Sequence, residues 1–316
     1  MAFFFYSSIE QRVKEWGLFM FEDFRREKIA IDDIEINLVV GGSGPPLLLL
    51  HGYPQTHIIW RMIAPRLAQT FTVIATDLRG YGDSSKPAGL PDHSNYSKRA
   101  MADDQVGVMR QLGFDSFLLC GHDRGGRVAH RLATDHPELV EKLVVLDIAP
   151  TKAMYEGTTM TFARAYYHWF FLIQAAPYPE TLIGRAPEAF LHHHMTRLAG
   201  LEPFMPDAWP EYVRQFSNPA TIHATCEDYR AAATIDLDHD TADIKGDRKV
   251  TCPLLALWGG HGIVERCFNP LEEWKKVATS VSGKALPCGH YIPEEVPDLL
   301  VEELMSFLKP ELSREM

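Results

Sequence analysis

Short runs of apolar residues alternate with amphipathic stretches along the first half of the chain. Four consecutive apolar residues, as in Leu47–Leu50, are typical of a strand buried on both faces. The pattern predicts strands at Lys28–Asp32, Ile34–Val40, Leu47–Leu50, Thr72–Thr76, Phe117–Cys120 and Leu143–Leu146. It predicts helices at Ile59–Ala68, Tyr96–Leu112 and Gly126–His136. This alternation indicates an α/β fold in which helices cover both faces of a parallel sheet.

The alternation stops at residue 150 and resumes near residue 250. Between these points the chain is rich in helix formers and aromatic residues, and prolines divide it into short helices. The α/β pattern then returns with Pro253–Trp258, Leu271–Val277, Lys284–Leu286 and the helix Pro293–Leu308. We therefore predict a core domain of residues 20–150 and 250–316, with a helical cap domain, 151–249, over the strand ends where open α/β sheets bind ligands. Residues 1–19 are expected to be an extra amphipathic segment before the core, either a helix or a consequence of the chosen start codon.

Composition and charge narrow the classes of function. The chain has 316 residues and a formal net charge of -11, which disfavours nucleic-acid binding and means that an anionic substrate would need local cations. No apolar stretch is long enough to span a membrane. The five cysteines show no CxxC spacing, which indicates reduced thiols and a cytoplasmic protein.

The segment GHDRGGR carries the clearest chemical signal. It follows the predicted strand Phe117–Cys120, and Gly121 and Gly125 leave room for the tight turn of a nucleophile elbow, with Asp123 at its tip. The helix that starts near Gly126 would favour a negative charge there. The alternative is that Asp123 is an ordinary N-cap residue.

Three further positions fit a catalytic role around this elbow. The loop that begins at His51 follows the strand Leu47–Leu50, and the backbone N–H groups of Tyr53 and Arg124 could form an oxyanion hole. The alternative is a plain turn. His290 follows the last strand. Hydrolases in which nucleophile, acid and histidine follow one another along the chain carry the base at this point. The third member of the site is an acid that orients His290. Glu265 comes several residues too late after the strand Pro253–Trp258. Asp147 ends an apolar strand, where a buried carboxylate needs a partner such as His290, and so it is the predicted acid.

An aspartate nucleophile restricts the reaction. A carboxylate attacks saturated carbon and leaves an alkyl ester on the protein. A base then activates water to cleave that ester at its carbonyl. The expected reactions are displacement of a halide or opening of an epoxide.

These motifs resemble the fluoroacetate dehalogenases, which are haloacetate hydrolases of the α/β-hydrolase superfamily. The likeness rests on GHDRGGR, the pair His168-Trp169, Asp147, CEDYRAAATID with Tyr229, and CGHY with His290, and it runs from about Met20 to the final helix. It implies that Asp123 displaces the halide and that Arg124 and Arg127 bind the substrate carboxylate. The implied halide donors are His168, Trp169 and Tyr229, and His290 with Asp147 would activate water. The resemblance also implies a homodimer, a small haloacid substrate and glycolate as product. We expect no cofactor.

Elementary electrostatics supports a role for the two arginines. A substrate carboxylate about 4 Å from Asp123 would be repelled by roughly 4 kcal/mol at an effective dielectric constant near 20. Two guanidinium groups near the elbow would offset that repulsion and orient the substrate. An epoxide hydrolase, a haloalkane dehalogenase and a non-catalytic receptor on the same fold are the alternatives.

The segment 190–212 does not match the resembled family closely, so the pocket mouth is not assigned. It contains three consecutive histidines, which would point about 100° apart on a helix and so could not converge on a metal ion. We predict no metal site, and we expect His192, His193 and His194 on the polar surface of the cap.

Overall fold

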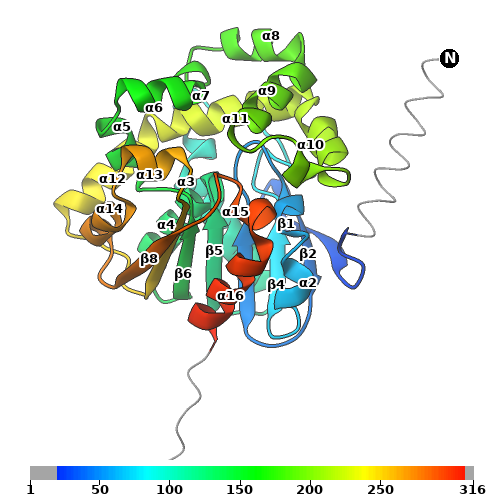
Figure 1. Cartoon of the computed structure of the whole chain (residues 1–316), viewed down its shortest axis with the longest axis vertical. Coiled ribbons are helices and arrows are strands. Elements are labelled where there is room, and N and C mark those ends of the chain that lie inside the picture. Colours follow the sequence, from blue (N-terminus) through cyan, green and yellow to red (C-terminus); the bar gives the residue numbers. More distant parts are fainter. Residues whose placement is uncertain (1–19, 310–316) are drawn as a thin grey trace, which may run out of the picture.

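A computed structural model describes residues 20–309 of the chain. Its centre is an eight-stranded sheet with the order β1-β2-β4-β3-β5-β6-β7-β8 (Figure 1). The first two strands form an antiparallel hairpin, β2 also pairs antiparallel with β4, and the six strands from β4 to β8 are parallel. The strands are β1 Arg25–Ile31, β2 Ile34–Gly41, β3 Pro46–Leu50, β4 Thr72–Thr76, β5 Phe117–His122, β6 Val140–Leu146, β7 Leu254–Gly259 and β8 Val281–Leu286.

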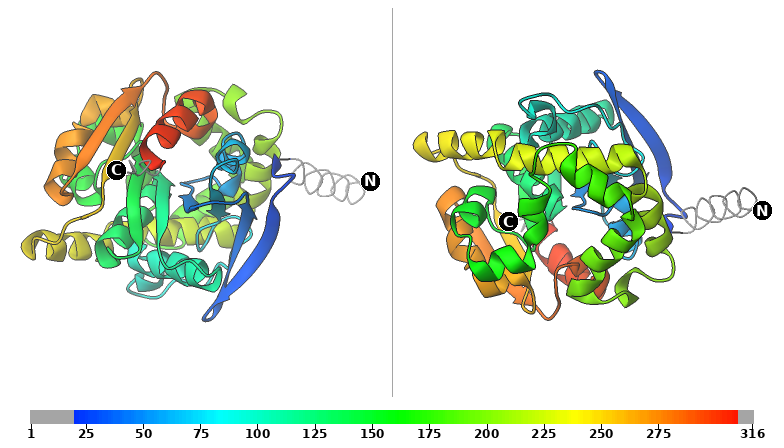
Figure 2. Two further views of the ribbon diagram at one scale, coloured as in Figure 1. Left: turned by 90° about the horizontal axis from the view of Figure 1, so that it is seen from below. Right: turned by 90° about the horizontal axis from the view of Figure 1, so that it is seen from above.

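Helices flank this sheet, as the views along it show (Figure 2). The flanking helices are α2 Ala64–Leu67, α3 Lys98–Gln111, α4 Arg124–Asp135, α13 Ile263–Cys267, α14 Pro270–Val277, α15 Ile292–Glu295 and α16 Pro297–Leu308. Short 3-10 helices, η1 His57–Trp60 and η2 Ser94–Tyr96, precede α2 and α3. The α/β architecture predicted from the alternating pattern is confirmed.

All described elements between β6 and β7 are helical, and we call Thr151–Lys245 the helical insertion. It lies above one edge of the sheet in Figure 1. Its elements are α5 Thr151–Glu156, α6 Met160–Ala165, α7 Tyr167–Phe171, α8 Tyr178–Gly184, α9 Pro187–Ala199, η3 Glu202–Phe204, α10 Ala208–Phe216, α11 Pro219–Ala232 and α12 Ile235–Lys245. The edge that the insertion covers is the one at which β5 and β6 end.

Two predicted helices are each divided in the structure. The predicted helix Ile59–Ala68 is a 3-10 turn followed by α2, and the predicted Pro293–Leu308 is α15 followed by α16. Pro65 and Pro297 explain these breaks, because proline cannot donate the backbone hydrogen bond that would continue a preceding helix. The predicted segment 1–19 lies outside the described residues.

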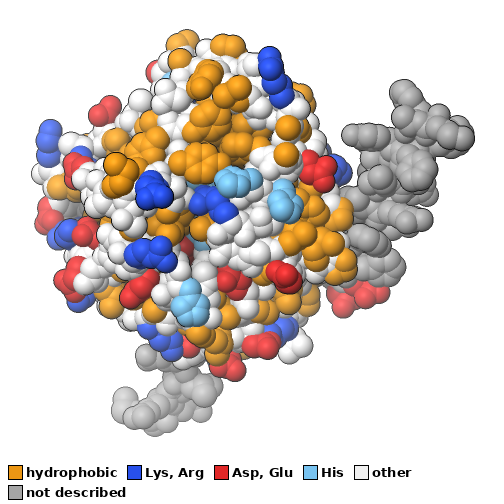
Figure 3. Space-filling model, turned by 45° about the horizontal axis from the view of Figure 1, so that its top comes forward, with side chains coloured by type: hydrophobic (Ala, Val, Ile, Leu, Met, Phe, Trp, Pro, Cys, Tyr) orange, Lys and Arg blue, Asp and Glu red, His pale blue; other side chains and the backbone are white. Residues whose placement is uncertain are grey.

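The parallel strands form the core of the molecule. All four residues of Leu47–Leu50 are fully buried, as a strand covered on both faces requires. Hydrophobic side chains are also gathered on the face that the helical insertion presents in Figure 3. Within the insertion, Met160, Tyr178 and Leu182 are large hydrophobic residues that are exposed. No helix among residues 20–309 is long and apolar enough to cross a membrane.

Candidate active site

Asp123 stands at the turn between β5 and α4. Its backbone φ of 46° lies in the left-handed region, which is uncommon for a residue other than glycine. A Cβ at Gly121 would lie 2.5 Å from Gly125 O, and one at Gly125 would lie 2.3 Å from His51 O. Only glycine therefore lets the strand, the turn and the helix come this close, and the carboxylate of Asp123 is held at the tip of the turn.

The loop after β3 holds one oxygen of this carboxylate. The backbone N–H of Tyr53 donates to Asp123 Oδ1 over 3.0 Å. His51 fixes the start of the loop, since its Nε2 accepts from Leu78 N at 3.0 Å and its Nδ1 lies 2.9 Å from Gly52 O. The predicted oxyanion-hole donor Tyr53 is thus already directed at the carboxylate, and the backbone of Arg124, the other predicted donor, begins α4 beside it.

His290 and Asp147 are paired beneath the helical insertion. Asp147 Oδ2 lies 2.5 Å from His290 Nδ1, and Asp147 Oδ1 accepts from Gly259 N at 2.9 Å. Burial lowers the pKa of His290, but the hydrogen bond and charge of Asp147 outweigh it and raise that pKa above 6.5. Glu265, the alternative acid, instead accepts a hydrogen bond from Trp258 Nε1.

The charge of Asp123 is stabilised by its surroundings although the residue is only 5% exposed. Burial raises the pKa of its carboxyl, but the nearby charges of His290 and Arg127 outweigh burial and hold the pKa below 3.8. Asp123 is consequently an ionised, largely dehydrated carboxylate at neutral pH.

Arg124 is fully buried and forms a two-pronged ion pair with Asp228 on α11. Its Nε donates to Asp228 Oδ2 at 3.0 Å, and its Nη2 donates to Oδ1 at 2.6 Å and to the backbone oxygen at 2.9 Å. Lys98 and Tyr81 also donate to the Asp228 carboxylate. These contacts leave Nη1 of Arg124 buried without a hydrogen-bond partner among the described residues.

Arg127 is buried without an ion pair in the described part of the chain. Its Nη1 donates to Ala149 O at 3.2 Å and to Thr151 Oγ1 at 3.0 Å, while Nη2 lies 3.1 Å from Met154 Sδ. All three partners are neutral, and Nε has none. Burial and then the charge of Arg124 lower the pKa of Arg127, while the charge of Asp123 opposes them. Arg127 is therefore a buried cation to which no carboxylate of the described chain bonds directly.

Rings from the helical insertion cover the two guanidinium groups. The Tyr229 ring lies 4.2 Å from Arg124 Cζ, and the Trp169 ring lies 4.6 Å from Arg127 Cζ. Tyr229 Oη and Trp169 Nε1 are buried and lack hydrogen-bond partners within residues 20–309. His168 lies 5.7 Å from the Tyr229 ring. The structure therefore brings the three predicted halide donors together beside the two arginines.

Some residues of this site were missed by sequence reasoning. His122 Nε2 lies 2.8 Å from the backbone oxygen of His290 and so links the elbow to the loop of the base. Burial lowers the pKa of His122 to about 3, so the ring is neutral. Asp228 was also missed, although both residues stand next to assigned ones in the quoted motifs.

The expectation that His194 lies on the polar surface is wrong. His194 is only 3% exposed, and its ring lies 4.5 Å from that of His168. It shares the inner face of α9 with Leu191 and Met195, which are three residues before it and one after it and are both buried. His192 and His193 are exposed, as expected.

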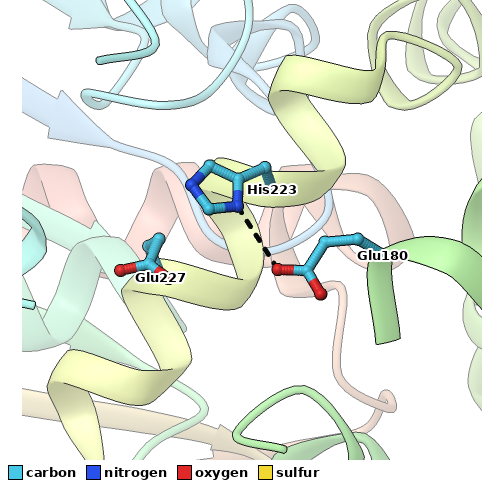
Figure 4. Close-up of side chains that lie close together, drawn as sticks. All are labelled: Glu180, His223 and Glu227. Atoms are coloured by element: carbon cyan, nitrogen blue, oxygen red, sulfur yellow. Dashed lines mark hydrogen bonds and ion pairs between the residues drawn. The ribbon is translucent and has the colours of Figure 1, made fainter. Parts of the chain in front are cut away.

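Glu180, His223 and Glu227 form a group whose side-chain atoms are close enough to bind a metal ion (Figure 4). The guanidinium of Arg230, however, donates to Glu180 Oε1 and to Glu227 Oε1, both at 2.7 Å. His223 Nδ1 lies 3.3 Å from Glu180 Oε1. Because a cation of the protein already neutralises both carboxylates, this group fits an ion-pair network better than a metal site.

The fold and this arrangement of aspartate, histidine and carboxylate at the strand ends define a hydrolase of the α/β type. Residues 45–295 match the family model described as the alpha/beta hydrolase fold, and the chain belongs to this family. A fluoroacetate dehalogenase from Burkholderia sp is 48% identical over 92% of this chain and 95% of its own. A soluble epoxide hydrolase from Corynebacterium sp. (strain C12) is 35% identical over 92% of this chain and 99% of its own. A solved structure from Nostoc sp PCC 7120, described as an alpha/beta hydrolase, is 56% identical with a TM-score of 0.90, covering 92% of this chain and 99% of that one.

Proposed function

We propose that this protein hydrolyses the carbon–halogen bond of haloacetates, fluoroacetate in particular, to give glycolate and halide. The observation that carries the proposal is the buried Arg127, whose partners are all neutral, beside an ionised Asp123. The 48% identical fluoroacetate dehalogenase supports the same reaction.

The charges of the site favour a small carboxylate as substrate. Asp228 compensates Arg124, which leaves the Arg127 cation and the Asp123 anion to balance each other across the site. A substrate carboxylate could accept hydrogen bonds from Arg124 Nη1 and Arg127 Nε, the two buried N–H groups without partners. Its charge would then be paired with Arg127, and its α carbon would be held toward Asp123.

In the first proposed step, Asp123 Oδ2 attacks the α carbon. Oδ1 is held by the Tyr53 N–H, whereas Oδ2 has no hydrogen-bond partner among the described residues and is available as nucleophile. A carbon–oxygen bond forms as the carbon–halogen bond breaks, and the electron pair leaves with the halide. His168, Trp169 and Tyr229 then donate hydrogen bonds to the departing halide as its charge develops.

In the second proposed step, His290 removes a proton from water, and the water oxygen attacks Cγ of Asp123. Negative charge develops on Oδ1, which already accepts from Tyr53 N–H, and the N–H of Arg124 is the second donor. The ester C–O bond then breaks, and glycolate takes the proton from His290. Asp123 retains one oxygen atom from the water, and the second proton of the water passes from its carboxyl group to solvent. Asp147 holds the imidazole in place and stabilises its charge throughout.

An epoxide hydrolase is the second candidate, favoured by the 35% identical relative and by two tyrosines of the helical insertion. Tyr166 Oη lies 3.3 Å from His290 Nδ1, and Tyr229 Oη has no partner in the described chain, so both could protonate an epoxide oxygen. That reaction, however, has no use for the charge of Arg127.

The deciding experiment compares halide release from fluoro-, chloro- and bromoacetate with hydrolysis of a neutral epoxide and of fluoroacetamide. We expect turnover of the acids and a loss of about a hundredfold for the amide, because the amide has no negative charge to pair with Arg127 and one acceptor oxygen in place of two. Arg127→Met should lower kcat/KM for the acids far more than for the amide. Epoxide turnover without release of any halide would contradict the proposal.

We also propose that residues 151–249 act as a cap over the site, that the protein is a homodimer, and that it works in the cytoplasm. The exposed hydrophobic residues of the helical insertion support a partner surface, and the five unpaired cysteines support a reducing compartment. Light scattering at several concentrations tests the dimer, and a single monomer mass throughout would contradict it.

A further inference from the structure

His168 is enclosed by aromatic and histidine rings of the site. It belongs to α7 and is 5% exposed. Its ring lies 4.5 Å from that of His194, 5.3 Å from that of Tyr166 and 5.9 Å from that of Tyr53. Burial, then the charges of His194 and Arg197, lower the pKa of His168 well below 6.5. A neutral imidazole carries one proton, and which of its two nitrogens holds that proton decides whether Nε2 can donate.

Arg197 on α9 contacts Nδ1, the other ring nitrogen of His168. Its Nη2 donates to His168 Nδ1 over 3.4 Å. Its Nη1 donates to Ala165 O, and its Cζ lies 5.5 Å from the Tyr167 ring, so the guanidinium is anchored between α6, α7 and α9. A guanidinium has only donors, and therefore His168 Nδ1 must present a lone pair to it.

We propose that Arg197 is a positioning residue, which holds His168 as the Nε2–H tautomer so that the ring can donate a hydrogen bond into the active site. The alternative tautomer would place an N–H of His168 against an N–H of Arg197 and lose the hydrogen bond. Among residues 20–309, no protein group bonds to His168 Nε2. The direction of this Nε2–H toward a departing halide rests on the proposed function. The tautomer of His168 does not depend on that function.

The hydrogen bonds of Arg197 within the described chain go to Ala165 and His168, so its effect on the reaction passes through His168. His194 has the ring nearest to His168, but the two rings meet edge to face at 84° and no hydrogen bond joins them in the described chain. Removing the guanidinium should therefore free His168 to adopt both tautomers, and only part of the population would retain the donor.

Nuclear magnetic resonance of the full chain labelled with ¹⁵N-histidine tests the tautomer directly. The nitrogen shifts separate a protonated from a bare ring nitrogen, and a His168→Gln variant assigns the signals. We expect wild-type His168 to carry its proton on Nε2 alone, Arg197→Met to show a mixture, and Arg197→Lys, which keeps a donor, to move back toward the wild-type pattern. A wild-type signal from an Nδ1–H tautomer, or an unchanged single tautomer in Arg197→Met, would overturn the proposal.

Single-turnover halide release then tests the consequence for chemistry. A poorer leaving group depends more on donors that act as charge develops, so Arg197→Met should slow fluoride release about two- to tenfold more than bromide release. Equal slowing for both halides would contradict the link through His168. Absence of halide release from the wild type would instead refute the proposed function, and the tautomer would still be decided by the spectrum. If Arg197→Met does not fold, the wild-type and Arg197→Lys spectra decide the tautomer.

Discussion

At the scale of single residues, Asp123 and His290 are expected to act in successive steps. Replacing His290 by Asn removes the base and one of the charges that lower the pKa of Asp123, but it leaves the carboxylate and the charge of Arg127 in place. With haloacetate, we expect one equivalent of halide and an ester that persists on Asp123, because water is no longer activated. Mass spectrometry of the Asp123 peptide measures the ester.

An exposed histidine provides the matched control for this variant. His261→Asn, in the loop after β7, should turn over like the wild type. An unmodified Asp123 peptide in His290→Asn, combined with continued turnover, would show that these two residues do not divide the reaction in this way.

The two steps should also differ in their pH dependence. The pKa of Asp123 lies below 3.8, so the carboxylate stays ionised and halide release in a single turnover should be constant from about pH 8 to 5. The pKa of His290 is raised above 6.5, mainly by Asp147 working against burial. Only neutral His290 can accept a proton, so ester hydrolysis should fall as the pH drops through that raised pKa.

The ester itself shifts the pH at which its hydrolysis slows. Esterification removes the charge of Asp123, which is one of the causes that raise the pKa of His290. The pH at which ester hydrolysis falls to half its maximum should therefore lie below the pKa of His290 measured by titration of the free protein. If halide release in a single turnover fell with pH in the same way as ester hydrolysis, this assignment of the two steps would be contradicted.

What sequence could reveal of the site depended on how local each signal is. Asp123, Tyr53 and His290 stand in short motifs at strand ends, so the alternating pattern was enough to locate them. Asp228 and His194 owe their roles to partners far away in the chain, at Arg124 and His168. For His194, the spacing from Leu191 on one helical face was the available signal, but a run of three histidines concealed it.

At the scale of elements, buried strands were easier to predict than helix boundaries. The strand Thr72–Thr76 was predicted with the bounds that the structure shows, because its apolar run is flanked by polar residues. The helices next to Pro65 and Pro297 were predicted as continuous. Proline, however, cannot donate the hydrogen bond that would extend the preceding helix, and it fits the first turn of the next one. Local composition thus defines where a strand is buried, while helix ends depend on single residues.

The ion pair between α4 and α11 should support both folding and substrate binding. Asp228→Asn leaves Arg124 and Lys98 as buried cations with reduced compensation. We expect a loss of about 3–5 kcal/mol in the free energy of unfolding, measured by urea denaturation. KM for haloacetate should rise, because Arg124 is no longer held with Nη1 free.

A surface aspartate of the next helix separates this effect from a general loss of charge. Asp238→Asn, at an exposed position of α12, should change stability by less than about 0.5 kcal/mol and leave KM unchanged. If Asp228→Asn kept wild-type stability and KM, the ion pair would have no role in positioning Arg124.

At the scale of the whole molecule, one buried arginine joins three separate segments. Arg61, which follows η1, donates to Glu294 on α15 and to Asp207 Oδ2 and Pro203 O of the helical insertion. Burial raises the pKa of Glu294 to about 7, although the charge of Arg61 and hydrogen bonds from Tyr212 and Gln55 oppose it. The sheet side and the insertion are therefore connected through a carboxyl whose charge is costly to bury.

Arg61→Met should destabilise the whole molecule, and more so at high pH. A carboxyl whose folded-state pKa is raised contributes stability below its unfolded value, near 4.5, and that stability is lost as the pH rises through the folded value. Without Arg61 this pKa rises further, so the loss relative to wild type should reach about 3–5 kcal/mol at pH 8 and be smaller at pH 5.5. Urea denaturation at both pH values measures it. Arg66→Met, which breaks only an ion pair with the 85% exposed side chain of Asp298, should cost less than about 1 kcal/mol at either pH. A loss for Arg61→Met that matched this control, or that did not depend on pH, would show that Glu294 carries no uncompensated charge and that the two parts of the molecule are held together by other contacts.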